Sequence, residues 1–131
     1  MGWRGRIGLV FPNDSDADDD YMRMVPNGVT AHVSRNQAPT SVLIDDLPSD
    51  NWIERTKTHF HDGHIEVAAR LLQPIHVSSI AYACVSGSFA GGPGYDRRIV
   101  DLLERIMEVP ATTGITAFFA ALNSLGVTSI S

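Results

Sequence analysis

The chain has 131 residues and a formal net charge of −5, from ten basic and fifteen acidic side chains. A domain of this length can bury a core without disulfides or metal, and the acidic balance excludes the basic surface that non-specific nucleic-acid binding needs. Cys84 is the one cysteine, which excludes an intrachain disulfide and favours a reducing, cytoplasmic location. The apolar run near the start is too short for a signal peptide or a membrane span, so we expect no membrane partner.

The first part of the chain is predicted to form a strand, a helix and a second strand. Residues 6–11 are an apolar run that ends at Pro12, which favours a buried parallel strand. The aspartates that follow suit the start of a helix over residues 18–25. Residues 29–34 alternate and are rich in β-branched side chains, which predicts a strand, and residues 36–50 are interpreted as a loop.

A long helix is predicted in the middle of the chain, over residues 50–72. Ser49 is a suitable N-cap, and Pro74 ends the helical pattern. This helix contains the sequence HFHDGH, in which His61 and His64 share one face. Because a zinc site needs three or four convergent ligands, we interpret the histidines as a solvated helix face and expect no metal.

The last part of the chain contains the cysteine and several further predicted elements. The prediction is a strand over residues 79–83, a glycine-rich loop over residues 84–94, a helix over residues 95–109, a short strand over residues 111–113 and a helix over residues 115–125. Gly126 suits the C′ position of the last helix. Residues 127–130 then read as the opening of another strand.

This alternation predicts an α/β fold, a three-layer sandwich with a parallel sheet of four to five strands. In such sheets ligands bind beyond the carboxyl ends of the strands, where Cys84 stands. The small residues after it allow backbone N–H groups and hydroxyls to face a bound anion, and the same dipoles favour a thiolate. The alternative is a buried cysteine that acts as a small hydrophobe. The pattern alone does not choose between them.

The segment IAYACVSGSFAGGPGYDRRIVDLLERIMEVPATTGITAFFAALNSLGV, from Ile80 to Val127, resembles the middle of maleate cis-trans isomerases and arylmalonate decarboxylases. Both belong to the aspartate/glutamate racemase superfamily, and the sequences RIGLVFP and VPNGVTAHVSR are similar to its first half. The resemblance covers nearly the whole chain. It implies a flavodoxin-like half of the racemase fold, with residues 1–126 as an N-terminal α/β domain and residues 127–131 as the start of a strand of a missing second half.

The resemblance also implies cofactor-independent chemistry on a small mono- or dicarboxylic acid that is held between two such halves. Cys84 matches the first-half cysteine, whose thiolate is implicated in covalent attack on the double bond in maleate isomerases. The turn after the first strand corresponds to a substrate-carboxylate loop, and the residues after Cys84 match positions that bind carboxylate or enolate oxygens. The implied substrate-binding residues are Pro12, Asn13, Ser15, Val85, Ser86, Gly87 and Ser88.

Other interpretations stay open. The aspartate-rich loop after Pro12 would repel an anionic substrate, and without a second half there is no second cysteine. The alternative function is therefore a catalytically incomplete half-domain that binds a small anion or a partner protein. Two further alternatives are a homodimer that brings Cys84 of two copies together and a separate second-half partner that completes the site.

Overall fold

The computed structural model describes residues 2–13, 15–37 and 62–129. Its centre is one parallel sheet with the strand order β2-β1-β3-β4. The strands are β1 (Gly5–Pro12), β2 (Val29–Asn36), β3 (Ser79–Tyr82) and β4 (Ala111–Thr113). In this register Val10 of β1 lies opposite Ser34 on one side and Tyr82 on the other. The predicted α/β fold with a parallel sheet is confirmed, with four strands in the described part of the chain.

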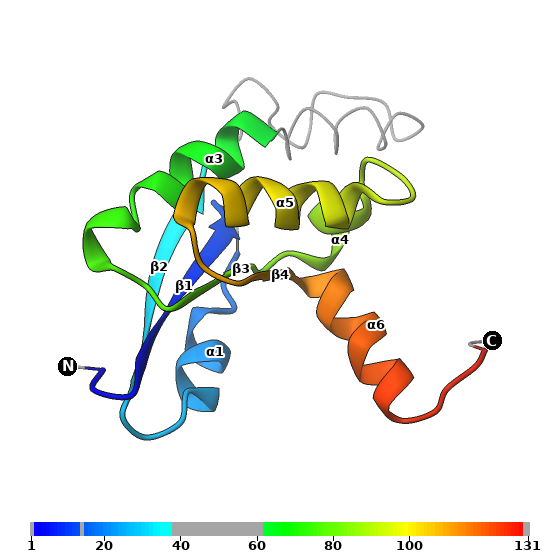
Figure 1. Ribbon diagram of the computed structural model, residues 1–131, viewed down its shortest axis with the longest axis horizontal. Helices are drawn as coiled ribbons and strands as arrows, with labels where there is room; N and C mark the ends of the chain where they lie inside the picture. The colour runs from blue at the N-terminus through cyan, green and yellow to red at the C-terminus, as the bar shows by residue number, and fades with distance from the viewer. Residues whose placement is uncertain (1, 14, 38–61, 130–131) are drawn as a thin grey trace.

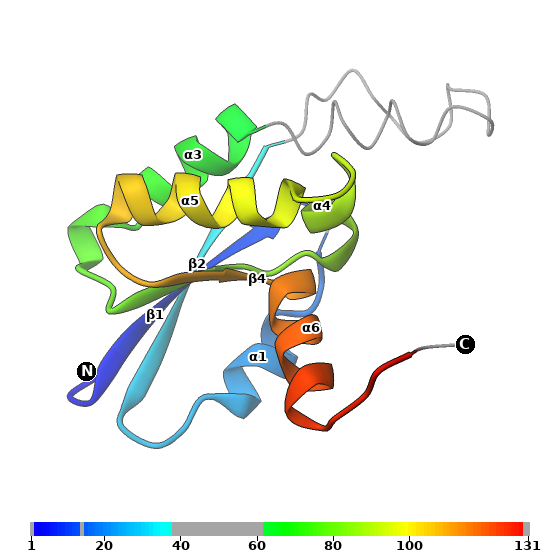
Figure 2. The ribbon, with the colours of Figure 1, turned by 45° about the vertical axis from the view of Figure 1, so that its right-hand side comes forward.

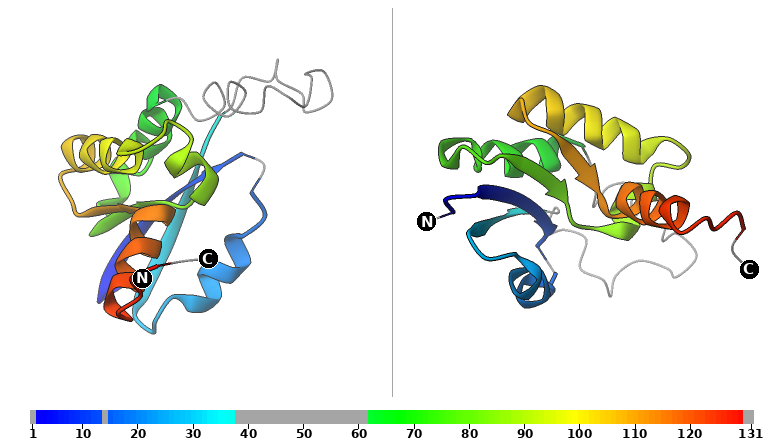
Figure 3. Two further views of the ribbon diagram at one scale, coloured as in Figure 1. Left: turned by 90° about the vertical axis from the view of Figure 1, so that its right-hand side faces the viewer. Right: turned by 60° about the horizontal axis from the view of Figure 1, so that its bottom comes forward.

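Helices cover both faces of the sheet, so the predicted three layers are present (Figure 1). Helices α3 (Asp62–Arg70) and α5 (Tyr95–Met107) lie on one face. Helices α1 (Asp18–Met24) and α6 (Gly114–Ser124) lie on the other face, as the two views of Figure 3 also show. The short helix α4 (Val85–Phe89) lies beyond the end of β3.

The main core fills the space between the sheet and the pair α3 and α5. Its buried members come from β1, β3, these two helices and, for Leu72, the turn that follows α3: Val10, Ile65, Ala68, Ala69, Leu72, Ile80, Tyr82, Ile99 and Leu103. The helical members repeat at the three- and four-residue spacing that the sequence predicted for each helix. Packing on this face therefore fixes the position of β3 in the domain. It also fixes the position of Cys84, which follows β3.

Three sequence-based boundaries are wrong. The predicted loop over residues 84–94 contains the helix α4, because Cys84 caps a helical turn that the glycines and serines did not reveal. Asn36, predicted to open a loop, is the last residue of β2. Residues 127–129 form no strand, and residue 130 of that prediction lies outside the described residues.

Part of the predicted long helix can be compared with the structure. Its carboxyl end is present as α3, followed by a 3-10 turn over Gln73–Ile75 that includes Pro74. The predicted loop beyond residue 37, the first part of the helix, and His59 and His61 lie outside the described residues. None of the helices in the described ranges has the length and apolar run needed to cross a membrane.

Candidate active site around Cys84

Cys84 lies at the carboxyl edge of the sheet, as the sequence predicted. The N–H of Ala83 donates to the carbonyl of Val10 at 2.8 Å, which continues the pairing of β3 with β1 past the last assigned strand residue. Cys84 itself is extended, with φ −139° and ψ 111°, and is the N-cap of α4. The backbone therefore turns at the cysteine, from strand into helix.

Two hydrogen-bonding groups lie next to the sulfur of Cys84. The N–H of Gly87 donates to Cys84 Sγ at 3.2 Å, and the hydroxyl of Ser86 lies 3.5 Å from the same atom. On its other side the half-buried Cys84 packs against the main core. The sulfur is thus neither enclosed among aliphatic side chains nor fully exposed. The hydrogen bond from the Gly87 N–H therefore fixes the position of the sulfur at the start of α4.

The four residues after Cys84 divide into two pairs. Val85 and Ser86 are exposed, whereas Gly87 and Ser88 are buried. The Ser88 hydroxyl donates to the carbonyl of Val85 at 2.8 Å and accepts the N–H of Ile115 at 3.2 Å. Because a hydroxyl has one proton to donate, Ser88 uses its donor inside the protein. Its hydroxyl joins the cysteine turn to α6, and Ser86 carries the exposed hydroxyl of the turn.

The loop after β1 lies at the same edge of the sheet, because β1 and β3 are adjacent and parallel. Pro12 is buried at the end of β1, and Asn13 is exposed. The N–H of Ser15 donates to the Pro12 carbonyl at 3.2 Å, and the Ser15 hydroxyl accepts the N–H of Ala17 at 3.4 Å. The structure thus brings the two predicted groups of site residues to neighbouring strand ends.

Arg35, which the sequence analysis missed, holds this first loop in place. From the end of β2 its guanidinium donates to the carbonyls of Pro12 and Ser15 at 3.0 and 2.9 Å. It also forms an ion pair with Asp18 and lies 5.9 Å from the ring centroid of Phe11. The motif VPNGVTAHVSR contains Arg35, but only the pairing of β1 with β2 places it beside this loop.

Polar residues behind the cysteine turn were missed as well. Thr113 ends β4 and caps α6, because its hydroxyl oxygen accepts the N–H of Thr116 at 3.1 Å. The Thr116 hydroxyl in turn donates to Asp96 in the first turn of α5, at 2.8 Å. A Cβ on Gly114 would come within 2.9 Å of Val85, so α6 begins directly against the turn. A threonine before a helical pattern is an N-cap signal that could have been found.

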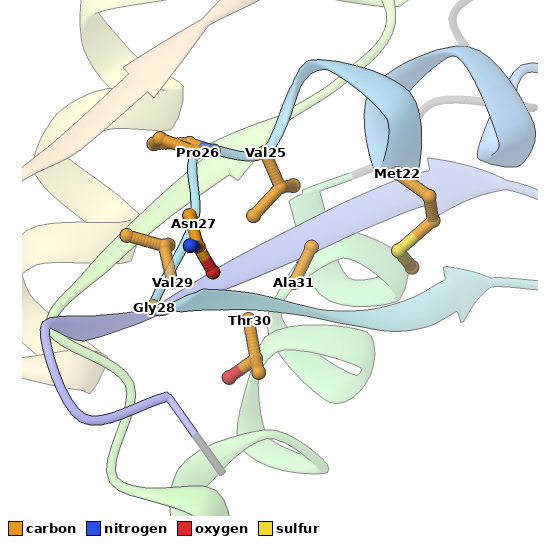
Figure 4. Close-up of a pocket in the computed structure, with 8 residues that line it drawn as sticks. All are labelled: Met22, Val25, Pro26, Asn27, Gly28, Val29, Thr30 and Ala31. Carbon is orange, nitrogen blue, oxygen red and sulfur yellow. The ribbon is translucent and has the colours of Figure 1, made fainter.

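A separate open pocket of about 360 Å³ lies at the opposite end of the sheet, between α1 and the start of β2 (Figure 4). It is lined by Met22 and by residues 25–31, none of which is charged. In parallel α/β sheets ligands bind beyond the carboxyl ends of the strands. This pocket is at the amino end, so we place the candidate active site at Cys84 and not there.

Comparison by sequence gives no assignment. The chain matches no known family model. No curated protein is significantly similar to it. The similarity to known proteins is therefore found by comparing three-dimensional structures.

Solved structures do share the fold. Maleate isomerase Iso from Pseudomonas putida S16 is 20% identical with a TM-score of 0.69. Unliganded arylmalonate decarboxylase is 22% identical with a TM-score of 0.65. A maleate cis-trans isomerase mutant from Nocardia farcinica, with a covalently bound succinylcysteine intermediate, is 18% identical with a TM-score of 0.67.

The alignments include 93% of this chain and 50%, 46% and 49% of those three chains, respectively. The chain therefore spans about half the length of the structures that it matches. Its fold is shared with these maleate isomerases and this arylmalonate decarboxylase, as the sequence resemblance predicted.

Proposed function

We propose that this chain supplies one side of a cysteine-dependent active site for isomerase- or decarboxylase-type chemistry on a small carboxylic acid. The observation that carries the proposal is the position of Cys84 Sγ at the carboxyl edge of the sheet, 3.2 Å from the N–H of Gly87. The structural neighbours include both activities. Among them, the isomerase with a succinylcysteine favours covalent addition by sulfur, and we therefore prefer isomerisation of maleate.

In the proposed reaction the thiolate of Cys84 adds to one carbon of the double bond. The π electron pair moves to the other carbon and spreads into its carboxylate, leaving a single bond that can rotate. Expulsion of the thiolate then restores the double bond in the trans acid. If the carbanion takes up a proton to give a succinyl adduct, the same proton is removed before the sulfur leaves, so the cycle balances. Splitting one difficult step into two easier ones is the general advantage of covalent catalysis.

The neighbouring groups have distinct proposed roles. The hydroxyl of the exposed Ser86 lies 3.5 Å from the sulfur and is proposed to stabilise the developing oxyanion. Asn13 and Ser15 are proposed to bind a substrate carboxylate from the loop after β1. Arg35 is a positioning residue, because its guanidinium is bonded to that loop. Ser88 is proposed to hold the turn and not to contact the substrate.

The lone cysteine allows a matched test of this proposal within one protein. Intact-mass spectrometry measures how fast maleate adds to the folded chain and to the same chain unfolded in urea. We expect the folded chain to form the adduct at least about tenfold faster, because the turn stabilises the charge that develops during addition. Proton NMR of the same mixture measures fumarate production, which Cys84→Ser should abolish and Ser86→Ala should slow.

The proposal is overturned if Cys84→Ser produces fumarate at the wild-type rate. It is equally overturned if the folded sulfur adds maleate no faster than the unfolded one. Ser124→Ala serves as the matched control for Ser86→Ala, since Ser124 is an exposed serine at the far end of α6. This control should leave both rates unchanged.

The second candidate is a half-domain that binds a small acid without turnover. It is favoured by one observation, that the chain spans about half of the structures that it matches. In that case maleate or malonate should protect Cys84 from alkylation by iodoacetamide, while no fumarate forms. Failure of either acid to protect the sulfur would count against binding at this site.

A further inference from the structure

A chain of hydrogen-bonded side chains lies behind the cysteine turn and ends at the carboxylate of Asp96. Asp96 is half-buried in the first turn of α5. Its Oδ2 atom accepts a hydrogen bond from the hydroxyl of Thr116, in the first turn of α6, at 2.8 Å. The two residues are 20 positions apart in the sequence, so this bond forms only when α5 and α6 pack against each other.

The direction of this chain follows from the number of protons that each hydroxyl carries. A threonine hydroxyl has one proton to donate, and Thr116 uses its proton in the bond to Asp96. The contact of 2.8 Å between the hydroxyls of Thr113 and Thr116 therefore uses the proton of Thr113. The Thr113 oxygen in turn accepts the backbone N–H of Thr116 at 3.1 Å. Both hydroxyls thus donate toward the carboxylate of Asp96, which completes the chain as its final acceptor.

The first turn of α6 connects this chain to the sulfur. Next to Thr116, the N–H of Ile115 donates to the Ser88 hydroxyl at 3.2 Å. Ser88 follows Gly87, whose N–H donates to Cys84 Sγ at 3.2 Å. In Figure 2, α4 lies beside the start of α5 and above the start of α6. A shift in the first turn of α6 is therefore passed to the group that holds the sulfur.

Asp96 also has a simpler role, because a negative charge is favourable in the first turn of a helix. That role concerns α5 alone and needs no hydrogen bond to another element. The surroundings of the chain point further. Thr113 is 1% exposed, so its hydroxyl depends on protein partners. A Cβ on Gly114 would come within 2.9 Å of Val85 Cγ2, so the start of α6 has little room to move against the cysteine turn.

We propose that Asp96 is a positioning residue for the sulfur of Cys84. Its carboxylate fixes the first turn of α6, and that turn fixes Ser88 and the adjoining Gly87 N–H that holds the sulfur. The inference deepens the proposed function and rests on it for the effect on maleate. The effect on the turn itself is independent of catalysis.

NMR measurement of amide exchange with water tests the effect on the turn, with the Gly87 N–H as the reporter. Gly87 lies in the first turn of α4, where N–H groups have no partner within the helix, so its protection reports the bond to sulfur. In Asp96→Ala we expect the Gly87 exchange rate, divided by that of Ala69 in the core, to rise at least about fivefold. Division by the Ala69 rate removes any general loss of stability. Asp96→Asn should restore the ratio to within about twofold of wild type, because its amide oxygen accepts the same hydroxyl.

Thr116→Val removes the same hydrogen bond from the other side. It should raise the ratio about as much as Asp96→Ala, and the double variant should raise it no further, because both changes remove one shared interaction. Asp101→Ala is the matched control and should leave the ratio unchanged, since Asp101 is an exposed aspartate of the same helix. Circular dichroism should show every variant folded. The inference is overturned if Asp96→Ala keeps the wild-type ratio, or if the effects of the two single variants multiply in the double variant.

The rate of maleate addition to the folded chain separates this inference from the proposed function. Asp96→Ala should lower that rate at least about fivefold and leave the rate in urea unchanged, because the sulfur is less well oriented. Asp96→Asn should restore it. If the wild-type sulfur gains no rate from folding, the proposed function fails, while the Gly87 ratio still decides the role of Asp96. If wild type and Asp96→Ala add maleate equally fast when folded, the role of Asp96 is overturned and the proposed function stands.

Discussion

The two faces of the sheet are stabilised in different ways. On the face of α3 and α5, one continuous core includes three buried apolar residues of α3 and two of α5. On the other face the sheet buries Leu9 and Phe11, but neither α1 nor α6 has a buried residue. One face therefore carries most of the apolar burial that stabilises the fold, whereas the other leaves large apolar side chains such as Phe118 and Phe119 exposed.

Helices α1 and α6 are held to the rest of the domain by individual polar and aromatic contacts and not by buried residues. Helix α1 is tied to the sheet by the ion pair of Asp18 with Arg35 and by Tyr21, whose ring packs edge to face on Phe11 at 5.1 Å. Helix α6 is tied at its first turn by the Thr113 cap and the bond from Ile115 to Ser88. Removing one such contact should lower the free energy of unfolding less than removing a buried leucine does. The variants below are therefore given in order of decreasing expected effect on stability.

The largest effect is expected in the core. Leu103→Ala should lower the free energy of unfolding by about 2–5 kcal/mol, because Leu103 is fully buried and its removal leaves a cavity. Phe119→Ala removes a larger but exposed side chain and should change it by no more than about 0.5 kcal/mol at a concentration where the chain is monomeric. Urea denaturation measures both. If both variants lost the same free energy of unfolding, the two faces of the sheet would contribute equally to stability.

A smaller effect is expected at the start of α6. Thr113→Val keeps the shape of a side chain that is 1% exposed but removes the helix cap and the partner of the Thr116 hydroxyl. We expect the free energy of unfolding to fall by about 1–2 kcal/mol. Val109→Thr, a reverse exchange at a half-buried position outside the helices, controls for the effect of exchanging valine and threonine. A Thr113→Val chain as stable as wild type would mean that α6 is held by other contacts.

The loss of stability expected at Arg35 is smaller than the losses expected at Leu103 and Thr113. Arg35→Met should lower the free energy of unfolding by about 1 kcal/mol, since its contacts are charge-assisted but only partly shielded from water. The proposed role predicts a larger effect on function, seen as weaker protection of Cys84 by maleate. Arg23→Met is the control, because Arg23 is exposed and lies 4.0 Å from Asp19. No change in protection by Arg35→Met would remove Arg35 from the site.

Sequence patterns were sufficient for the elements with strong periodicity. The apolar run of β1 and the apolar spacing of α5 are patterns of residues close together in the sequence. The bounds of both elements were therefore predicted to within a few residues. Helix α4 was missed because glycine and serine carry little helical preference. Its first turn forms where Cys84 caps it and Ser88 ties it to α6, and the second of these contacts is long-range.

The same division applies to the candidate site. The position of Cys84 followed from the end of an apolar strand, a local signal. The roles of Arg35 and Ser88 did not, because their partners lie 20 and 27 residues away and meet them only when strands and helices pack. Sequence reasoning gave Ser88 a role in binding substrate, whereas its hydroxyl donates to Val85 inside the protein.

The hydrogen bond from the Ile115 N–H to the Ser88 hydroxyl connects α6 directly to the turn that carries Cys84. A displacement of α6 must therefore either move the turn that carries Cys84 or break the hydrogen bond between Ile115 and Ser88. By thermodynamic linkage, if binding of any molecule at α6 changed the affinity of the turn for a ligand, the ligand would change the affinity for that molecule by the same factor.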